Sequence, residues 1–187
     1  MTRVMLPLCL GLWLLSVPIA RVAQADPAAR AGRATQRVLR VVKSERLMIY
    51  EEDGEVVRRF TVALGFAPVG DKAKRGDGRT PEGSLYVAWK NPRSQFHRFL
   101  GLSYPMPSHA ERAAAAGALE AKTLASIRGA VGRRSTPPQN TSLGGAVGIH
   151  GGGAGADWTL GCVAVTDDEI EWLFERVRVG DRVIIEP

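Results

Sequence analysis

Short runs of β-branched and aromatic residues, separated by turn residues, are the feature that most restricts how this chain folds. Residues 37–43 and 46–50 are two such runs, and residues 55–64 continue the pattern with partial alternation of apolar and polar side chains. Asp53 and Gly54 lie between the last two runs, and an Asp-Gly pair favours the tight turn of a hairpin. The sequence therefore predicts that the fold opens as an antiparallel sheet.

Later segments add another strand and a helical insertion to this sheet. Residues 84–89 form a strand pattern, which we expect to end before Pro92 because proline cannot donate a hydrogen bond to a ladder. Residues 108–129 are rich in Ala, Glu, Leu and Arg, a composition that favours helix, with a break near Gly117. This stretch is predicted to be a helical insertion between strands.

A second helix signal follows the last cysteine. Thr166 and Glu169 match a capping box, so a helix is predicted from Asp167 to about Val177. Three further segments are strand-like: residues 146–150, 162–165 and 182–186. The chain is therefore predicted to be mostly β with short helices.

The first 25 residues have the layout of a secretory signal. Arg3 supplies a positive charge, residues 4–20 are almost wholly apolar, and Ala23 and Ala25 form a small-x-small cleavage site. We assign residues 1–25 to a signal peptide and expect export to the periplasm or cell envelope. A membrane anchor that stays uncleaved is the alternative, since the apolar run is at the short limit for spanning a bilayer.

The rest of the chain divides into a tether, residues 26–36, and one domain, residues 37–187. No later segment is long and apolar enough to cross a bilayer, so we expect no stable membrane span after cleavage. Loss of Arg3 and Arg21 would lower the formal net charge from +6 to +4. This balance suits an anionic wall surface and argues against a nucleic acid partner.

Cysteine usage points to one unusual thiol. Cleavage would remove Cys9 and leave Cys162 alone in an oxidising compartment, where structural cysteines normally occur in pairs. A lipoprotein role for Cys9 is disfavoured because most of the apolar stretch follows it. An unpaired Cys162 could pair between chains, lie inert in the core, or react.

The residues around Cys162 favour the reactive alternative. His150 ends a predicted strand and Cys162 opens another, so adjacent strands would place an imidazole beside the thiol as its general base. Gly161 permits a sharp turn, at which the backbone amides of Leu160, Gly161 and Cys162 could stabilise an oxyanion. With His150 as its base, we expect this thiol to react with an alkylating probe faster than a free thiol near neutral pH.

At these positions the chain resembles the L,D-transpeptidase catalytic domain (YkuD-like) family, in its periplasmic, murein-processing branch. Residues 148–151 and 159–163 are similar to the family's His-Gly and Ser/Thr-x-Gly-Cys signature. Residues 76–83 are similar to its Thr-Pro-x-Gly segment, and residues 90–97 with 102–105 resemble segments of that branch. The resemblance spans nearly all of residues 37–187.

The resemblance implies a β-sandwich-like catalytic domain and a two-step acyl transfer on peptidoglycan stem peptides. Cys162 would attack a tetrapeptide stem to give a thioacyl enzyme, and His150 would act as general base and then general acid. The carbonyl of Gly151 would orient the imidazole, and Thr159 matches the hydroxyl of the motif and would steady the loop. The resemblance implies no metal and no organic cofactor.

The acceptor of the acyl group stays open at this point. An amine of a neighbouring stem would give crosslinking, a lipoprotein lysine would give anchoring, and water would make the protein an L,D-carboxypeptidase or a hydrolase of lipoprotein links. A non-catalytic wall-binding module that keeps the fold is the alternative from a different class.

The sequence indicates a functional role less strongly for other polar and aromatic residues. His97 is a substrate contact, an alternative base, or a half-exposed loop or strand residue, and Tyr104 and Trp158 are packing residues or substrate platforms. His109 is predicted to be solvated. The basic loop formed by Lys72, Lys74, Arg75 and Arg79 is interpreted as a solvated turn, with a contact for stem carboxylates as the alternative.

Two further kinds of ligand site have little support from spacing. A zinc site would need His97, His150 and Cys162, but no pair of these has close ligand spacing. The glycine run at residues 151–155 lacks the Lys-Ser/Thr and the helix start of a phosphate-binding loop. We therefore interpret that run as a flexible rim of the active site.

Overall fold

The computed structural model describes residues 34–187. The predicted signal peptide, Cys9 and most of the predicted tether lie outside the described residues. No helix in the described part of the chain is both long and apolar enough to cross a membrane.

In the first half of the sheet, buried side chains alternate with more exposed ones along most strands, as the sequence predicts. It contains four strands: β1 (Arg37–Val42), β2 (Leu47–Glu52), β3 (Glu55–Thr61) and β8 (Arg182–Glu186). β2 is antiparallel to β1 and β3, whereas β8 is parallel to β1. Leu39 lies opposite both Tyr50 and Val183, and all three side chains are buried. Successive side chains point to opposite faces of a strand, so this register gathers the apolar set on one face.

β4 (Gly83–Ser94) links the two halves of the sheet. Its first part pairs with β8, and its second part pairs with β5 (His97–Leu102). The expectation that this strand stops before Pro92 is wrong. The ladder shifts register between Asn91 and Ser94, and such an irregularity accommodates a residue without an N–H.

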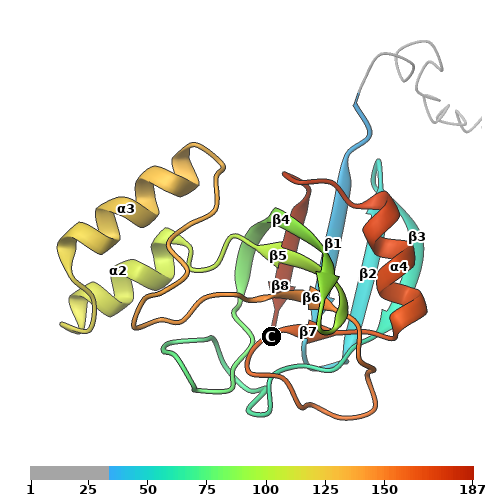
Figure 1. Cartoon of the computed structure of the whole chain (residues 1–187), viewed down its shortest axis with the longest axis horizontal. Helices are drawn as coiled ribbons and strands as arrows, with labels where there is room; N and C mark the ends of the chain where they lie inside the picture. Colours follow the sequence, from blue (N-terminus) through green and yellow to red (C-terminus); the bar gives the residue numbers. More distant parts are fainter. Residues whose placement is uncertain (1–33) are drawn as a thin grey trace, which may run out of the picture. The chain divides into compact units, whose positions relative to one another are not determined.

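The second half of the sheet carries the candidate site. β6 (Gly148–His150) pairs with β5, and β7 (Val163–Ala164) pairs in parallel with β6. The sheet order is β3-β2-β1-β8-β4-β5-β6-β7. The amide and carbonyl of Ala63, just after β3, bond with those of Ala164 at 2.9 and 2.8 Å. The sheet therefore curls until its two ends meet (Figure 1).

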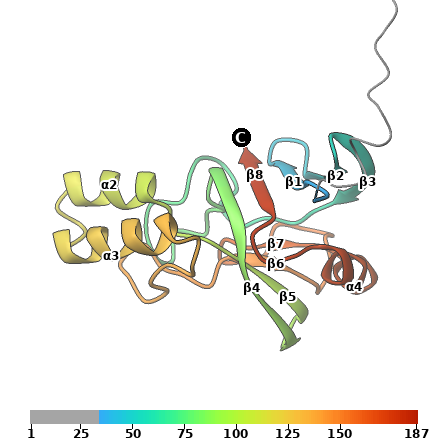
Figure 2. The same ribbon diagram turned by 90° about the horizontal axis from the view of Figure 1, so that it is seen from above.

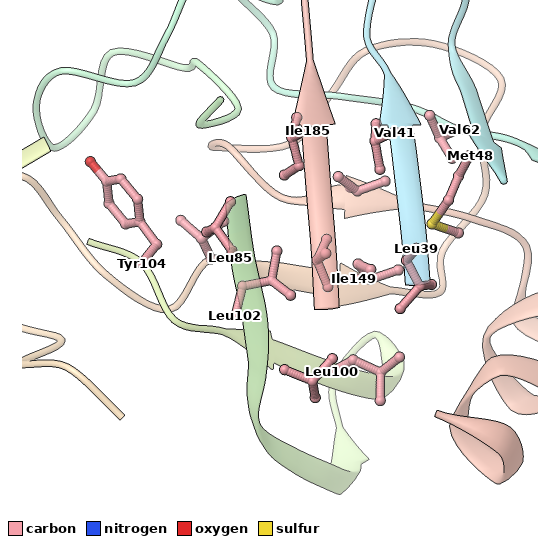
Figure 3. Close-up of a cluster of buried hydrophobic side chains, with 14 of the residues drawn as sticks. Leu39, Val41, Met48, Val62, Leu85, Leu100, Leu102, Tyr104, Ile149 and Ile185 are labelled. Carbon is pink, nitrogen blue, oxygen red and sulfur yellow. The ribbon is translucent and has the colours of Figure 1, made fainter. Parts of the chain in front are cut away.

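The core lies between the two halves of this curled sheet. Figure 3 shows Leu39 and Val41 of β1 with Ile185 of β8 on one side, and Leu100 of β5 with Ile149 of β6 on the other. At most 1% of each of these residues is exposed. Burial of an aliphatic side chain contributes about 1.5–3 kcal/mol, so the apolar contacts hold the strand ends that carry the site.

Three helices complete the domain: α2 (Pro107–Ala115), α3 (Ala121–Gly132) and α4 (Asp167–Arg176). α2 and α3 confirm the predicted insertion with its break near Gly117. They lie side by side at one end of the domain, and α4 lies at the other (Figures 1 and 2). α4 begins with the predicted capping box, in which Thr166 and Glu169 bond each other's backbone amides.

The helical insertion is tied to the loop before β4 by polar contacts. His109 of α2 is 3% exposed, and its Nε2 lies 3.3 Å from a carboxylate oxygen of Asp71, which Arg112 also contacts. The expectation that His109 is solvated is therefore wrong. Its acidic partner lies 38 residues earlier in the chain, which local sequence does not reveal.

Candidate active site

One cavity of about 760 Å³ opens at the second half of the sheet. Its wall comes from the β4–β5 hairpin, the segment that leads into β6, and the turn that leads into β7. Both His150 and Cys162 line this cavity. The two residues that the sequence singled out are therefore brought to one space.

The strand register explains why they meet. His150 pairs with Ala164 across the parallel β6–β7 ladder. Alternate residues of an extended segment share a face, so Cys162 falls on the same face as Ala164 and His150. Two neighbouring strand ends thus present the imidazole and the thiol to the same cavity.

His150 lies among aromatic rings. Its ring stacks on Phe96 at 4.5 Å and on Phe99 at 6.0 Å between centroids, and it meets Trp158 edge-on at 5.5 Å. Only 1% of His150 is exposed. This burial lowers the pKa of His150 below its ordinary value, against the opposing effect of the hydrogen bond with Gly151. The imidazole is therefore neutral at neutral pH.

The backbone of Gly151 fixes which nitrogen of His150 carries the proton. Nδ1 of His150 lies 2.6 Å from the carbonyl oxygen of Gly151. A carbonyl only accepts hydrogen bonds, so Nδ1 must carry the proton and donate it. In the neutral ring, Nε2 is then left unprotonated and can act as a base.

Cys162 is a largely protonated thiol at neutral pH in the resting structure. Its Sγ lies 3.6 Å from the carbonyl oxygen of Ala146, to which the S–H donates. Cys162 keeps some exposed surface. Burial nevertheless raises the pKa of its thiol to about 11, although the Gly148 N–H and the charge of Lys72 both act to lower this pKa. The fast alkylation expected near neutral pH stays a prediction, and this raised pKa argues against it because alkylation needs the thiolate.

Two threonines hold the turn that carries the cysteine. The hydroxyl of Thr159 donates to the carbonyl of Cys162 at 2.8 Å and accepts from the amide of Gly161 at 3.1 Å. The hydroxyl of Thr80 lies 3.3 Å from the same Cys162 carbonyl. Thr80 belongs to the Thr-Pro-x-Gly segment, so two of the sequence motifs meet at this turn.

The amides proposed for an oxyanion site differ in their availability. The Gly161 amide is already bonded to Thr159, whereas no acceptor within residues 34–187 bonds the amides of Leu160 or Cys162. Gly161 has a φ of 131°, and a Cβ at this residue would lie 2.6 Å from the carbonyl oxygen of Arg79. Only glycine fits this turn without strain.

Asp157 anchors the glycine-rich segment at residues 151–157. One carboxylate oxygen accepts from the amide of Leu64 at 2.9 Å, and the other accepts from Arg46 at 2.7 Å. Local sequence does not reveal this role, because both partners lie about a hundred residues earlier in the chain.

In the basic loop before β4, Lys74, Arg75 and Arg79 are exposed as expected, but Lys72 is not. The side chain of Lys72 is only 3% exposed, and its Nζ bonds Asp77 at 2.7 Å. Burial alone would raise the pKa of Asp77, but hydrogen bonds from Lys72 and three backbone amides lower it to about 2. Lys72 therefore forms a buried ion pair and is not part of a solvated loop.

The other residues with a possible role at the site lie in different places. The Nε2 of His97 lies 2.7 Å from Glu171 on α4, and His97 does not line the cavity. Tyr104 is fully buried and bonds the carbonyl of Leu143, so it is a packing residue. Trp158 does line the cavity, with its indole N–H on Gly153.

The proposed zinc ligands do not gather. His97 is directed to Glu171 and away from the pair formed by His150 and Cys162. Among residues 34–187, no group of three or more His, Cys, Asp or Glu side chains is placed to hold a metal ion.

The sequence did not identify the rest of the cavity wall. Phe96, Phe99 and Trp89 line the cavity, and Arg93 is the one lining residue with a fixed charge. β5 shows no alternation of apolar and polar side chains that would predict a strand, because four consecutive residues at its end, 99–102, are buried. The aromatic wall therefore became visible only once β5 was seen beside β6.

The fold and the site together define a class of β-sheet catalytic domain in which a cysteine and a histidine face one cavity. Residues 36–185 match the model of the YkuD family, described as the L,D-transpeptidase catalytic domain. The chain belongs to this family, which consists of acyltransferase- and peptidase-type enzymes. The family assignment indicated by the sequence motifs is therefore confirmed.

Solved structures of low sequence identity share the fold. An L,D-transpeptidase from Mycobacterium smegmatis is 14% identical over 82% of this chain and 60% of its own, with a TM-score of 0.50. A variant of the helical cell shape determining protein Pgp2 from Campylobacter jejuni is 19% identical over 81% of this chain and 46% of its own, with a TM-score of 0.53. The chain thus spans about half to three fifths of those proteins. A comparison with curated protein sequences gave no match.

Proposed function

We propose that this protein is an exported peptidoglycan L,D-transpeptidase that forms a thioacyl intermediate on Cys162. The observation that carries the proposal is the pairing of a neutral thiol with a neutral imidazole in one cavity, with Nδ1 of the imidazole already bonded to Gly151. The substrate would be a tetrapeptide stem of the bacterial wall. In this proposal residues 1–25 are the export signal.

The first step moves one proton and exchanges two bonds at the substrate carbonyl. Cys162 Sγ attacks the carbonyl carbon between diaminopimelate and the terminal D-alanine, and the thiol proton passes to Nε2 of His150. When the carbon–nitrogen bond breaks, the imidazolium returns this proton to the leaving amine. D-alanine departs and a thioester remains on Cys162.

Backbone amides would stabilise the charge that develops on the carbonyl oxygen. The N–H groups of Leu160 and Cys162 are the candidates, because they have no bonding partner in the described chain. The loss of one such donor typically costs about 10²–10³ in kcat. The Gly161 amide would contribute to the same site by keeping Thr159, and therefore the turn, in place.

The second step transfers the acyl group to an acceptor. An amine nucleophile would lose a proton to His150 as its nitrogen attacks the thioester, and the departing Cys162 sulfur would regain a proton. A stem amine gives a crosslink, a lipoprotein lysine gives an anchored lipoprotein, and water gives hydrolysis by the same groups.

Mass analysis of purified disaccharide-tetrapeptide incubated with the protein tests the proposal. We expect the wild type to form a crosslinked product or to release D-alanine, with a transient acyl adduct on the peptide that contains Cys162. Cys162→Ala should show none of these, and neither should His150→Gln. His97→Gln is the matched control, because His97 lies outside the cavity.

The outcome separates an enzyme from a wall-binding module. Turnover that survives in Cys162→Ala would overturn the proposed nucleophile. Stem binding without any product or adduct in the wild type would support the non-catalytic alternative.

A further inference from the structure

A buried lysine lies against the turn that carries the cysteine. Lys72 bonds Asp77 and the carbonyl of Lys74, at 2.7 and 3.2 Å, and 3% of its side chain is exposed. A buried ammonium is costly unless an acid and further acceptors surround it. Asp77 and the Lys74 carbonyl compensate the free-energy cost of burying this ammonium near Cys162. An uncharged side chain at the same position would carry no such desolvation cost.

The placement of the ammonium brings its charge close to the nucleophile. Nζ of Lys72 lies 3.5 Å from the position that a Cβ would take on Gly161, the residue directly before Cys162. The side-chain stem also packs beside Gly144, with Cε 3.6 Å from the corresponding Cβ position there. The lysine thus lies close to both segments that border the thiol: the 159–162 turn and the segment that leads from Gly144 to Ala146.

The neighbouring charged groups do not share this placement. Arg75 bonds Asn140 and the carbonyl of Thr141, and the guanidinium of Arg79 is directed to the carbonyl of Asp71. On the cavity side, the residues with titratable or charged groups besides Cys162 are His150, which is neutral, and Arg93.

We propose that Lys72 is a positioning residue of the nucleophile: its buried ammonium, held by Asp77, lies beside the 159–162 turn and supplies the positive charge near which the thiolate forms. This inference rests on the proposed function of Cys162. The charge of Lys72 favours ionisation of the thiol, as its lowering effect on the pKa of Cys162 indicates. A fixed charge in a partly desolvated site acts more strongly than one in water.

The chain offers a matched control in a second buried lysine. Lys43 also has a 3% exposed side chain, and its Nζ lies 2.7 Å from Glu82. It bonds the carbonyls of Gly70 and Thr80, so it holds the same loop as Lys72. Lys43 is not among the groups that shift the pKa of Cys162. A comparison of the two lysines therefore separates an electrostatic effect on the thiol from support of the loop.

The experiment measures alkylation of Cys162 by iodoacetamide between pH 7 and 10, followed by mass analysis of the peptide that contains Cys162. Lys72→Met should reduce the alkylation rate at pH 8 about tenfold, since one pKa unit changes the thiolate fraction tenfold. Lys72→Arg should restore most of the rate. Lys43→Met should alkylate like the wild type, although it should also lower the thermal unfolding temperature.

A folding defect has its own control. If Lys72→Met does not fold, Lys72→Met with Asp77→Asn removes both charges together, and replacement of a buried pair is much less costly than removal of one partner. Folding of every variant is checked by circular dichroism. An alkylation profile equal to that of the wild type in either folded variant would overturn the proposal, as would an equal loss in Lys43→Met.

The alkylation assay does not depend on turnover. Failure of the wild type to process stems would contradict the proposed function, yet the alkylation profiles would still decide whether Lys72 acts on the thiol. Where stems are processed, Lys72→Met should lower kcat with little change in KM.

Discussion

Two cavities of this domain differ in the charge state of the residues that line them. The cavity of about 430 Å³ beside β8 and α3 is lined by Arg37, Arg134, Arg182 and Asp181. Arg134 lies over the ring of Tyr86 and donates to the carbonyl of Gly180, so its guanidinium already has partners within the domain. The larger cavity, in contrast, holds a thiol and an imidazole that burial keeps neutral.

Under the proposed function, this difference explains why only the larger cavity would be reactive. The proposed proton transfer starts from a protonated thiol and an unprotonated nitrogen of a neutral imidazole. Fixed guanidinium charges cannot fill either role, because arginine stays protonated in proteins.

The largest expected effect tests the chemical side of the comparison. Cys162→Ala and His150→Gln should each reduce stem turnover by about 10³-fold or more, because the nucleophile and its base act as a unit. Arg182→Gln in the smaller cavity should leave turnover unchanged. The measurement is the initial rate of product formation from tetrapeptide muropeptide, and equal losses in all three variants would remove the distinction between the cavities.

The second effect tests the 159–162 turn, which carries the thiol. Gly161→Ala should lower kcat about 10²-fold and destabilise the domain by about 2 kcal/mol, because a Cβ would meet the Arg79 carbonyl at a φ of 131°. Gly153→Ala is the matched control, since Gly153 also has a positive φ, 97°, but has nothing within 4 Å of its Cβ position. Chemical denaturation and turnover assays should give Gly161→Ala the larger loss in both.

The third effect is a pH dependence. His150 must be neutral to accept the thiol proton, and burial lowers its pKa below 6.5. We therefore expect kcat/KM to fall only below pH 6.5, with a limiting slope of about tenfold per pH unit. An acid limb centred above pH 6.5 would show that the imidazole is not buried as described.

The same burial links protonation of His150 to stability. The unfolded chain binds this proton more readily than the folded chain, so the contribution is fully present above pH 6.5 and is lost as the pH falls towards the folded pKa. His150→Gln should therefore show less acid destabilisation than the wild type when both are unfolded by urea at pH 7 and pH 5.

The smallest expected effect concerns the one fixed charge in the larger cavity. Arg93 has no ion-pair partner among residues 34–187, so its guanidinium is available for a stem carboxylate. Arg93→Gln should raise KM about five- to tenfold, in line with about 1–1.5 kcal/mol for an exposed charged contact, and should leave kcat unchanged. A stem with amidated carboxyl groups should not respond to Arg93→Gln, and an equal KM increase for both stems would exclude carboxylate recognition.

Local patterns predicted the elements whose signals are local. Alternation gave the strands that begin the sheet, and the capping box of Thr166 and Glu169 placed the start of α4. β5 was missed because buried residues follow one another along it, which leaves no alternation to read. β4 continued beyond Pro92 because a register shift absorbed the proline.

Burial of polar residues was the weakest part of the prediction. Lys72 and His109 were expected in solvent, and Tyr104 was considered as a substrate contact, yet all three are buried. A charged or polar side chain enters the interior only where a partner satisfies it. The partner of His109 comes from a distant segment, and the loop that buries Lys72 closes against the 159–162 turn from the far end of the chain.

The sequence by itself determined the strand periodicity, the helix start at Asp167, the glycine turn before Cys162, and the motifs that identify the family. Only the tertiary structure decided that His150 and Cys162 share a cavity, that aromatic rings surround the imidazole, and that a lysine lies below the thiol. The physical reason is that desolvation and charge act through space. Strand pairing sets those distances, so residues far apart in the sequence determine the protonation states of His150 and Cys162.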